Sequence, residues 1–136
     1  MSYALSAALQ AGVFQTLSAD AVLTGLVGSD IYDALPSGTP PPLYVSLGQE
    51  TALDASDKTG RGAVHRFTIR VTSDAPGFTT AKSVAGAVCD ALLDQSIPLT
   101  RGRLVSMNFD RASATRTDSG NARQIDLRFR ARVEDS

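Results

Sequence analysis

The stretch that decides the fold is ARQIDLRFRARV, residues 122–133, near the end of the chain. Apolar and polar residues alternate along it, with the period of two that a β-strand with one buried face requires. The apolar positions are Ile125, Leu127, Phe129, Ala131 and Val133, and the polar ones are Gln124, Asp126, Arg128, Arg130 and Arg132. We therefore expect a strand with one apolar face and one face that is mostly arginine.

Other segments repeat or complete this pattern. Residues 117–121, TDSGN, form a turn signal between this strand and a strand-like run over residues 103–116, so the two predict a hairpin. Residues 63–73 alternate in the same way, with Arg66 and Arg70 on the polar side. Residues 43–48 also alternate, and residues 31–35 predict a brief extended segment.

Two longer amphipathic helices are predicted, over residues 2–17 and 79–94. Their apolar stripes are Leu5, Leu9, Val13 and Leu17 in the first, and Ala81, Val84, Ala85, Val88 and Leu92 in the second. A short helix between them is expected to start at an N-cap on Ser18 and to stop at Gly28. The third helix is expected to be capped by Thr79 or Thr80 and to end before Pro98.

The connections complete an α+β prediction. Residues 36–42 hold four prolines and predict a stiff surface loop, and residues 50–62 predict a long polar loop. We expect one domain over residues 1–136, with an antiparallel or mixed sheet of about four main strands. The two longer helices should cover its apolar face.

Charge is divided unevenly along the chain. Residues 1–57 carry six acids and no Lys or Arg, whereas the remainder carries thirteen bases and eight acids. The two parts therefore have charges of −6 and +5, which give the net charge of −1. This division suits copies that meet head to tail, acidic surface on basic surface, and it equally suits two segments that fold against each other.

Composition points to a cytoplasmic protein. No apolar run approaches the roughly 20 residues of a membrane helix, and the N-terminus lacks a signal peptide pattern. The single cysteine, Cys89, cannot form an internal disulfide and is expected to be a small buried apolar residue. His65 is the only histidine, and its place among apolar residues favours packing over catalysis.

No motif in the sequence predicts catalysis, a cofactor or a metal. Residues 60–62, Gly-Arg-Gly, precede a strand, whereas phosphate loops open a helix. Asp54 and Asp57 resemble the start of a calcium loop, but Lys58 occupies a ligand position. The arginine face has no aromatic residues on which bases could stack, so we expect no direct nucleic-acid recognition. Passage of DNA past the protein stays open.

Several segments in a common order carry a family resemblance. They are residues 23–28 (LTGLVG) and 31–33 (IYD), Pro41 and Pro42 before residues 43–48 (LYVSLG), Lys58, Gly62, His65, Gly77, Ala91, Leu92, residues 102–105 (GRLV), and residues 125–131 (IDLRFRA). In this order and spacing, over nearly the whole chain, the sequence resembles the tail terminator (tail completion) proteins of long-tailed phages. It is most similar to the version in gene transfer agents, the phage-like particles that carry host DNA.

The resemblance implies an α+β subunit of a six-membered ring. In such particles the ring sits on the head-proximal end of the tail tube, stops tube polymerisation and offers a surface to head-completion proteins. The expected partners are therefore further copies of the chain, the tail tube protein and a head-completion or connector protein, with DNA only passing through the lumen. The resemblance brings no catalytic residues, no membrane and no small-molecule substrate.

The charge pattern, rather than the family, supplies the candidate interface. The acidic candidates are Asp20, Asp30, Asp33, Asp54 and Asp57, and the basic ones are Lys58, Arg61, Arg66, Arg70, Arg128, Arg130 and Arg132. We expect the arginine face of one copy to meet Asp20, Asp30 and Asp33 of the next, and residues 54–61 to meet the tube. Two other functions stay open, namely a different head-tail joining or tube-like virion subunit and a stand-alone cytoplasmic binding module.

Overall fold

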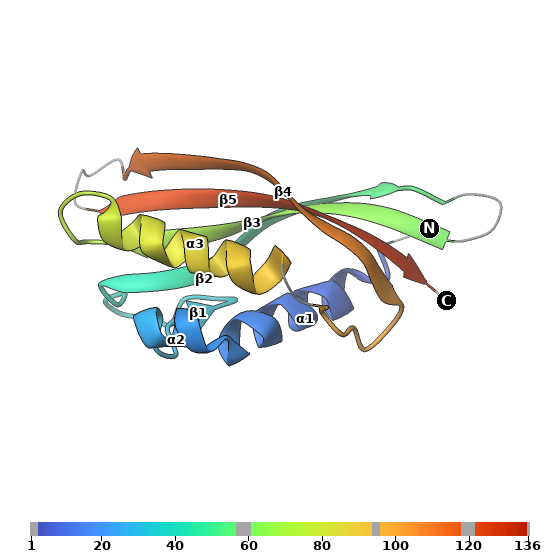
Figure 1. The fold of residues 1–136 in the computed structure, drawn as a ribbon, viewed down its shortest axis with the longest axis horizontal. Helices are drawn as coiled ribbons and strands as arrows, with labels where there is room; N and C mark the ends of the chain where they lie inside the picture. Colours follow the sequence, from blue (N-terminus) through green and yellow to red (C-terminus); the bar gives the residue numbers. More distant parts are fainter. Residues whose placement is uncertain (1–2, 57–60, 94–95, 118–121, 136) are drawn as a thin grey trace.

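The computed structural model describes residues 3–56, 61–93, 96–117 and 122–135. Its elements are α1 (Ser6–Ala19), α2 (Ala21–Val27), β1 (Ile31–Tyr32), β2 (Leu43–Asp54), β3 (Arg61–Ser73), α3 (Thr79–Leu93), β4 (Arg103–Arg116) and β5 (Arg123–Asp135). The strands form one sheet in the order β1-β2-β3-β5-β4, and the helices lie on one of its faces (Figure 1). The predicted α+β class is confirmed.

The sheet is mixed because only β1 runs parallel to its neighbour. Ile31 and Tyr32 pair with Val45 and Ser46 of β2, and all other neighbouring strands are antiparallel. The sheet thus has five strands instead of about four. The fifth strand, β1, lies within residues 31–35, where a brief extended segment was predicted, and it spans only two residues.

The core lies between the sheet and the helices, as the alternation predicted. Ile125, Leu127, Phe129, Ala131 and Val133 are all buried, and so are their partners on β3. The predicted stripes of both longer helices are buried against them, with Leu5 and Leu17 of the first fully inaccessible. These side chains form one contiguous cluster, so the helices are held to the sheet mainly by the burial of apolar surface.

The predicted long loop over residues 50–62 is wrong at both ends. β2 continues to Asp54 and β3 already begins at Arg61. A register shift between Leu47 and Glu50 interrupts the alternation, and the strand then resumes with Glu50 opposite Phe67. Such a bulge changes which parity faces the core, so the continuation has no clean period in the sequence.

Two helix boundaries also differ from the prediction. α1 begins at Ser6, and the start expected at Ser2 lies outside the described residues. The N-cap of α2 is Asp20 and not Ser18, because the Asp20 carboxylate accepts a hydrogen bond of 2.9 Å from the backbone N–H of Leu23. Gly28, with φ of 62°, ends this helix as predicted.

Candidate assembly surface on the outer face of the sheet

The outer face of the sheet is built from the polar parity of β3 and β5. In the register of these strands, Arg66 lies opposite Arg130, Thr68 opposite Arg128, and Arg70 opposite Asp126. Arg66, Arg70, Arg128 and Arg130 are exposed, because the helices occupy only the other face. The predicted arginine face is therefore present, and three strands bring it together, since β4 adds a further row beside β5.

Some of these arginines are held by partners within the chain. Arg70 donates to Asp126 through Nε at 2.7 Å and through Nη2 at 3.2 Å. This hydrogen-bonded pair raises the pKa of Arg70, so the guanidinium stays charged. Arg132 donates from Nη2 to the backbone carbonyl of Ala55 at 3.0 Å. Within a single copy, Arg70 therefore stabilises the sheet and Arg132 holds the backbone just after β2.

Four other arginines lie in two directly opposed pairs. Arg66 faces Arg130 across β3 and β5, and Arg111 faces Arg128 across β4 and β5. Within the described part of the chain, none of these four forms an ion pair with a carboxylate. Like charges directly opposite each other destabilise a sheet. An anion supplied by a partner would therefore stabilise this part of the face more than the rest of it.

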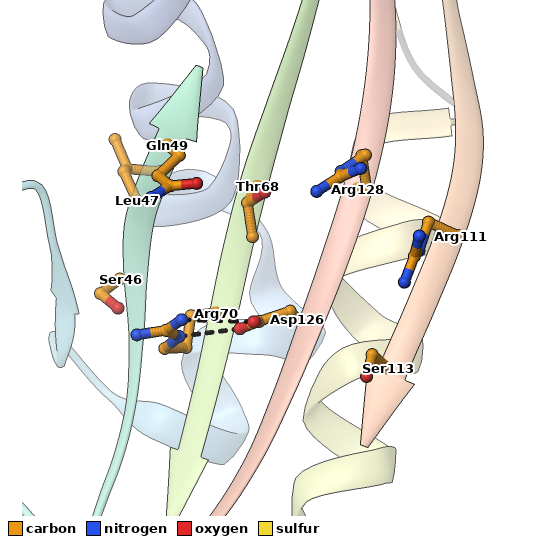
Figure 2. Close-up of a pocket in the computed structure, with 10 residues that line it drawn as sticks. Ser46, Leu47, Gln49, Thr68, Arg70, Arg111, Ser113, Asp126 and Arg128 are labelled. Atoms are coloured by element: carbon orange, nitrogen blue, oxygen red, sulfur yellow. Dashed lines mark hydrogen bonds and ion pairs between the residues drawn. The ribbon is translucent and has the colours of Figure 1, made fainter. Parts of the chain in front are cut away.

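A hollow of 340 Å³ lies over the same face (Figure 2). Residues of β2, β3, β5 and β4 line it, including Thr68, Arg111, Ser113 and Arg128. In Figure 2, Arg128 and Arg111 stand on adjacent strands, apart from the paired Arg70 and Asp126. The hollow thus presents guanidinium and hydroxyl donors together, which suits an oxyanion.

The acidic candidates differ in how far they are already engaged within the chain, which the sequence did not show. Asp20 is engaged as the cap of α2, and Asp30 accepts a hydrogen bond from the hydroxyl of Tyr32, which raises the pKa of that phenol. Asp54 accepts from the hydroxyl of Ser56 at 2.7 Å. Asp33 is exposed, directly after β1. It is therefore the most available acid of the set that precedes β2.

The remaining candidates lie near the turn between β2 and β3. Arg61 is exposed at the start of β3, opposite Asp135 of β5. Asp57 and Lys58 lie outside the described residues.

Comparison with known proteins gives the family. The model of the family described as tail completion protein gp17 matches residues 11–134. The chain belongs to this family. The resemblance inferred from the sequence is thereby confirmed, and it covers nearly the whole chain. No curated protein sequence matches it.

A solved structure supports the same assignment for this tail completion family member. A chain from the virion of a native gene transfer agent particle is 58% identical and superposes with a TM-score of 0.92. The match covers 98% of this chain and 99% of that one. The family and this likeness together support a structural protein of a tail or virion.

In this family member the only histidine lies on the helix-facing side of the sheet, among packed side chains. His65 is fully buried, and its Nδ1 lies 3.4 Å from Oε2 of Glu50. Cys89 is half-buried rather than buried, and desolvation raises the pKa of its thiol. Within the described residues, no three His, Cys, Asp or Glu side chains gather as a metal site. No helix among them is long and apolar enough to span a membrane.

Arg111 is the surface residue that sequence reasoning missed. It shares sequence parity with Phe109, which suggests the core side, but a register shift between these two residues turns Arg111 to the outer face. The sequence does contain a signal for this shift: the apolar residues change from an odd position, Phe109, to even positions, Ala112 and Ala114. A change of parity within a strand indicates a bulge.

Proposed function

We propose that this protein forms a ring on the head-proximal end of a tail tube, ends polymerisation of the tube and provides the joint to the head-completion proteins. The observation that carries this proposal is the 58% identity, over almost all of both chains, to a chain of a gene transfer agent virion. Membership in the tail completion family supports it independently. The ring is proposed to hold six copies and to act in the assembled particle, after synthesis in the cytoplasm of the producing cell.

Charge complementarity is the proposed force between copies. The first 57 residues carry a charge of −6 and the remainder +5, so a head-to-tail arrangement brings opposite signs together. Arg66, Arg128 and Arg130 are exposed on the sheet and have no carboxylate partner among the described residues. They are proposed to meet the acidic segment of the adjacent copy.

The tube is proposed to meet the turn between β2 and β3. β2 ends at Asp54 and β3 begins at Arg61. These adjoining strand ends lie on the far side of the molecule from α2 (Figure 1). A ring that binds the last tube ring through this end, and presents a different surface on its other end, leaves no site for another tube subunit. That asymmetry would end polymerisation and leave the second surface for the connector, with DNA passing through the lumen.

The proposed role in termination can be tested by removing the protein from particle assembly. Tail tubes made without it should exceed normal length and fail to join heads, and the purified protein added to polymerising tube protein should stop elongation. Tubes of normal length in its absence would rule out termination. Binding to the head-completion protein but not to the tube would indicate a head-side joint, and a stable monomer binding neither would indicate a stand-alone module.

The arginine face can be tested by reversing two charges. Arg128→Glu together with Arg130→Glu should reduce ring formation by about tenfold or more, because each change replaces attraction by repulsion across the interface. Native mass spectrometry measures the ring fraction. Arg116→Glu, an exposed arginine at the end of β4, is the matched control and should assemble normally. Normal assembly of the double variant would show that the face is only solvated.

A further inference from the structure

Two of the arginines that line the hollow on the outer face lie next to each other. Arg111 and Arg128 are directly opposed on neighbouring antiparallel strands, and both line the hollow. Directly opposed residues in such a ladder have Cα atoms about 4.5–5.5 Å apart, so both guanidinium groups can reach one small anion. Neither of them forms an ion pair with a carboxylate within the described residues.

The other lining groups define the kind of anion. Thr68 and Ser113 add hydroxyls, and the nearby Asp126 is already engaged by Arg70. No aromatic side chain lines the hollow, so it offers no platform for stacking a nucleic-acid base. A volume of 340 Å³ accepts a carboxylate side chain with its flanking peptide rather than a duplex.

Asp33 is an exposed carboxylate of the acidic segment and a candidate to enter such a hollow in another copy. It is exposed, follows β1 at the sheet edge opposite to β4, and is not ion-paired among the described residues. The segment after it, residues 34–40, is exposed throughout and contains Pro36 and Pro40, which limit its conformations. An exposed, stiff segment loses little entropy when it docks.

We propose that Asp33 of one copy enters the hollow of the next copy and binds between Arg111 and Arg128. In a ring of like-oriented copies the contact is heterologous, so two different surfaces of the subunit meet. Asp33 follows β1 at one edge of the sheet and Arg111 lies on β4 at the other, so the two proposed partners belong to different surfaces. The inference rests on the proposed ring and adds to it a specific contact, in which Arg111 is a new participant.

A charge exchange tests this contact. Arg111→Glu and Asp33→Arg should each lower the ring fraction about tenfold or more, because each places like charges together in a partly desolvated site. The variant that combines both should restore the ring, since it rebuilds the pair in the opposite sense. Native mass spectrometry over a concentration series gives the ring fraction, and circular dichroism of each variant checks folding. Milder variants, Arg111→Gln and Asp33→Asn, serve if a reversal prevents folding.

The outcomes separate this contact from the ring itself. Restoration by the combined variant supports the pairing, with Arg116→Glu as the control that should leave the ring intact. A wild-type ring that is unaffected by Arg111→Glu, or single losses that the combination does not rescue, would overturn the pairing and leave the ring standing. A wild-type protein that forms no ring, even on tube protein, would refute the proposed function. Loss of binding to a DNA oligonucleotide on Arg111→Glu would assign the hollow to phosphate instead.

Discussion

At the scale of single residues, Glu50 connects the N-terminal segment to the sheet. Its carboxylate accepts hydrogen bonds from the hydroxyl of Ser6, at 2.7 Å, and from that of Tyr3. His65, which stacks against Tyr3, lies 3.4 Å from the same carboxylate. Both ring nitrogens of His65 are buried without a hydrogen-bond partner among the described residues. The carboxylate is therefore the polar group on which this small cluster depends.

Replacing Glu50 should destabilise the fold more than replacing an exposed ion-pair partner. Glu50→Ala should lower the free energy of unfolding by about 1–3 kcal/mol, because the buried hydroxyl of Ser6 loses its acceptor. Glu134→Ala, which removes the exposed pair with Arg103, should cost about 1 kcal/mol or less. Urea denaturation measures both. An equal or smaller loss for Glu50→Ala would show that the cluster contributes little.

Gly102 is a second residue with a specific physical requirement. Its φ is 68°, and an added Cβ would lie 2.5 Å from the carbonyl oxygen of Glu134 and 2.9 Å from Cδ2 of Leu5. Gly77 has a similar φ of 76°, but an added Cβ there would meet nothing within 4 Å. A side chain at Gly77 would therefore meet backbone strain alone, whereas one at Gly102 would meet backbone strain and steric overlap together.

These two glycines give a matched prediction. Gly77→Ala should cost about 1–2 kcal/mol, the cost of a left-handed conformation for an L-residue. Gly102→Ala should cost about 1–3 kcal/mol more, since it also forces backbone and Leu5 to move. Thermal and urea unfolding of both variants provide the comparison. Similar losses at the two positions would mean that the segment before β4 shifts freely.

At the scale of elements, boundaries and bulges decide which residues face outward. β4 has register shifts between Leu104 and Ser106 and between Phe109 and Arg111. Each shift reverses the parity of the residues after it in the strand, which is how Arg111 joins the outer face while Ala112 takes the other. β4 is also an edge strand, and Phe109 on it is 45% exposed beside Phe129. The edge is therefore partly apolar as well as basic.

The start of α2 gives a prediction at this scale. Asp20→Ala should lower the free energy of unfolding by about 0.5–2 kcal/mol, because the N–H of Leu23 loses its side-chain acceptor. Ser18→Ala is the control and should be close to neutral, since Ser18 is exposed within α1. Chemical denaturation distinguishes the two. If Ser18→Ala is the costlier change, the cap lies where the sequence first suggested.

At the scale of the whole molecule, charge and shape act together. The acidic segment includes α1, α2, β1 and β2, whereas all the described bases lie in the part of the chain from β3 to β5, on these strands and α3 except for Arg101 just before β4. β1 and β4 lie at opposite edges of the sheet. The acidic segment therefore forms one side of the sheet, and the basic segment forms the other. Copies in a head-to-tail ring would then meet with opposite signs.

This arrangement predicts a strong dependence of assembly on salt. Exposed charges more than about 8–10 Å apart are largely screened at physiological ionic strength, so the proposed ring should dissociate progressively as salt is raised. Native mass spectrometry and light scattering over a salt series measure the effect. A ring that is indifferent to salt would point to apolar contacts such as Phe109, and a monomer at every salt concentration would mean that assembly requires the tube.

The sequence by itself determined the class of fold, the alternating faces of β3 and β5, the buried stripes of both longer helices and the family. Each of these comes from a local period or an ordered set of short segments, which a linear chain displays directly. It could not show that Asp20 caps α2, that β2 continues past Gly48, or that Arg111 opposes Arg128. Those features depend on bulges and on strand neighbours far apart in the chain, so only the tertiary structure decided them.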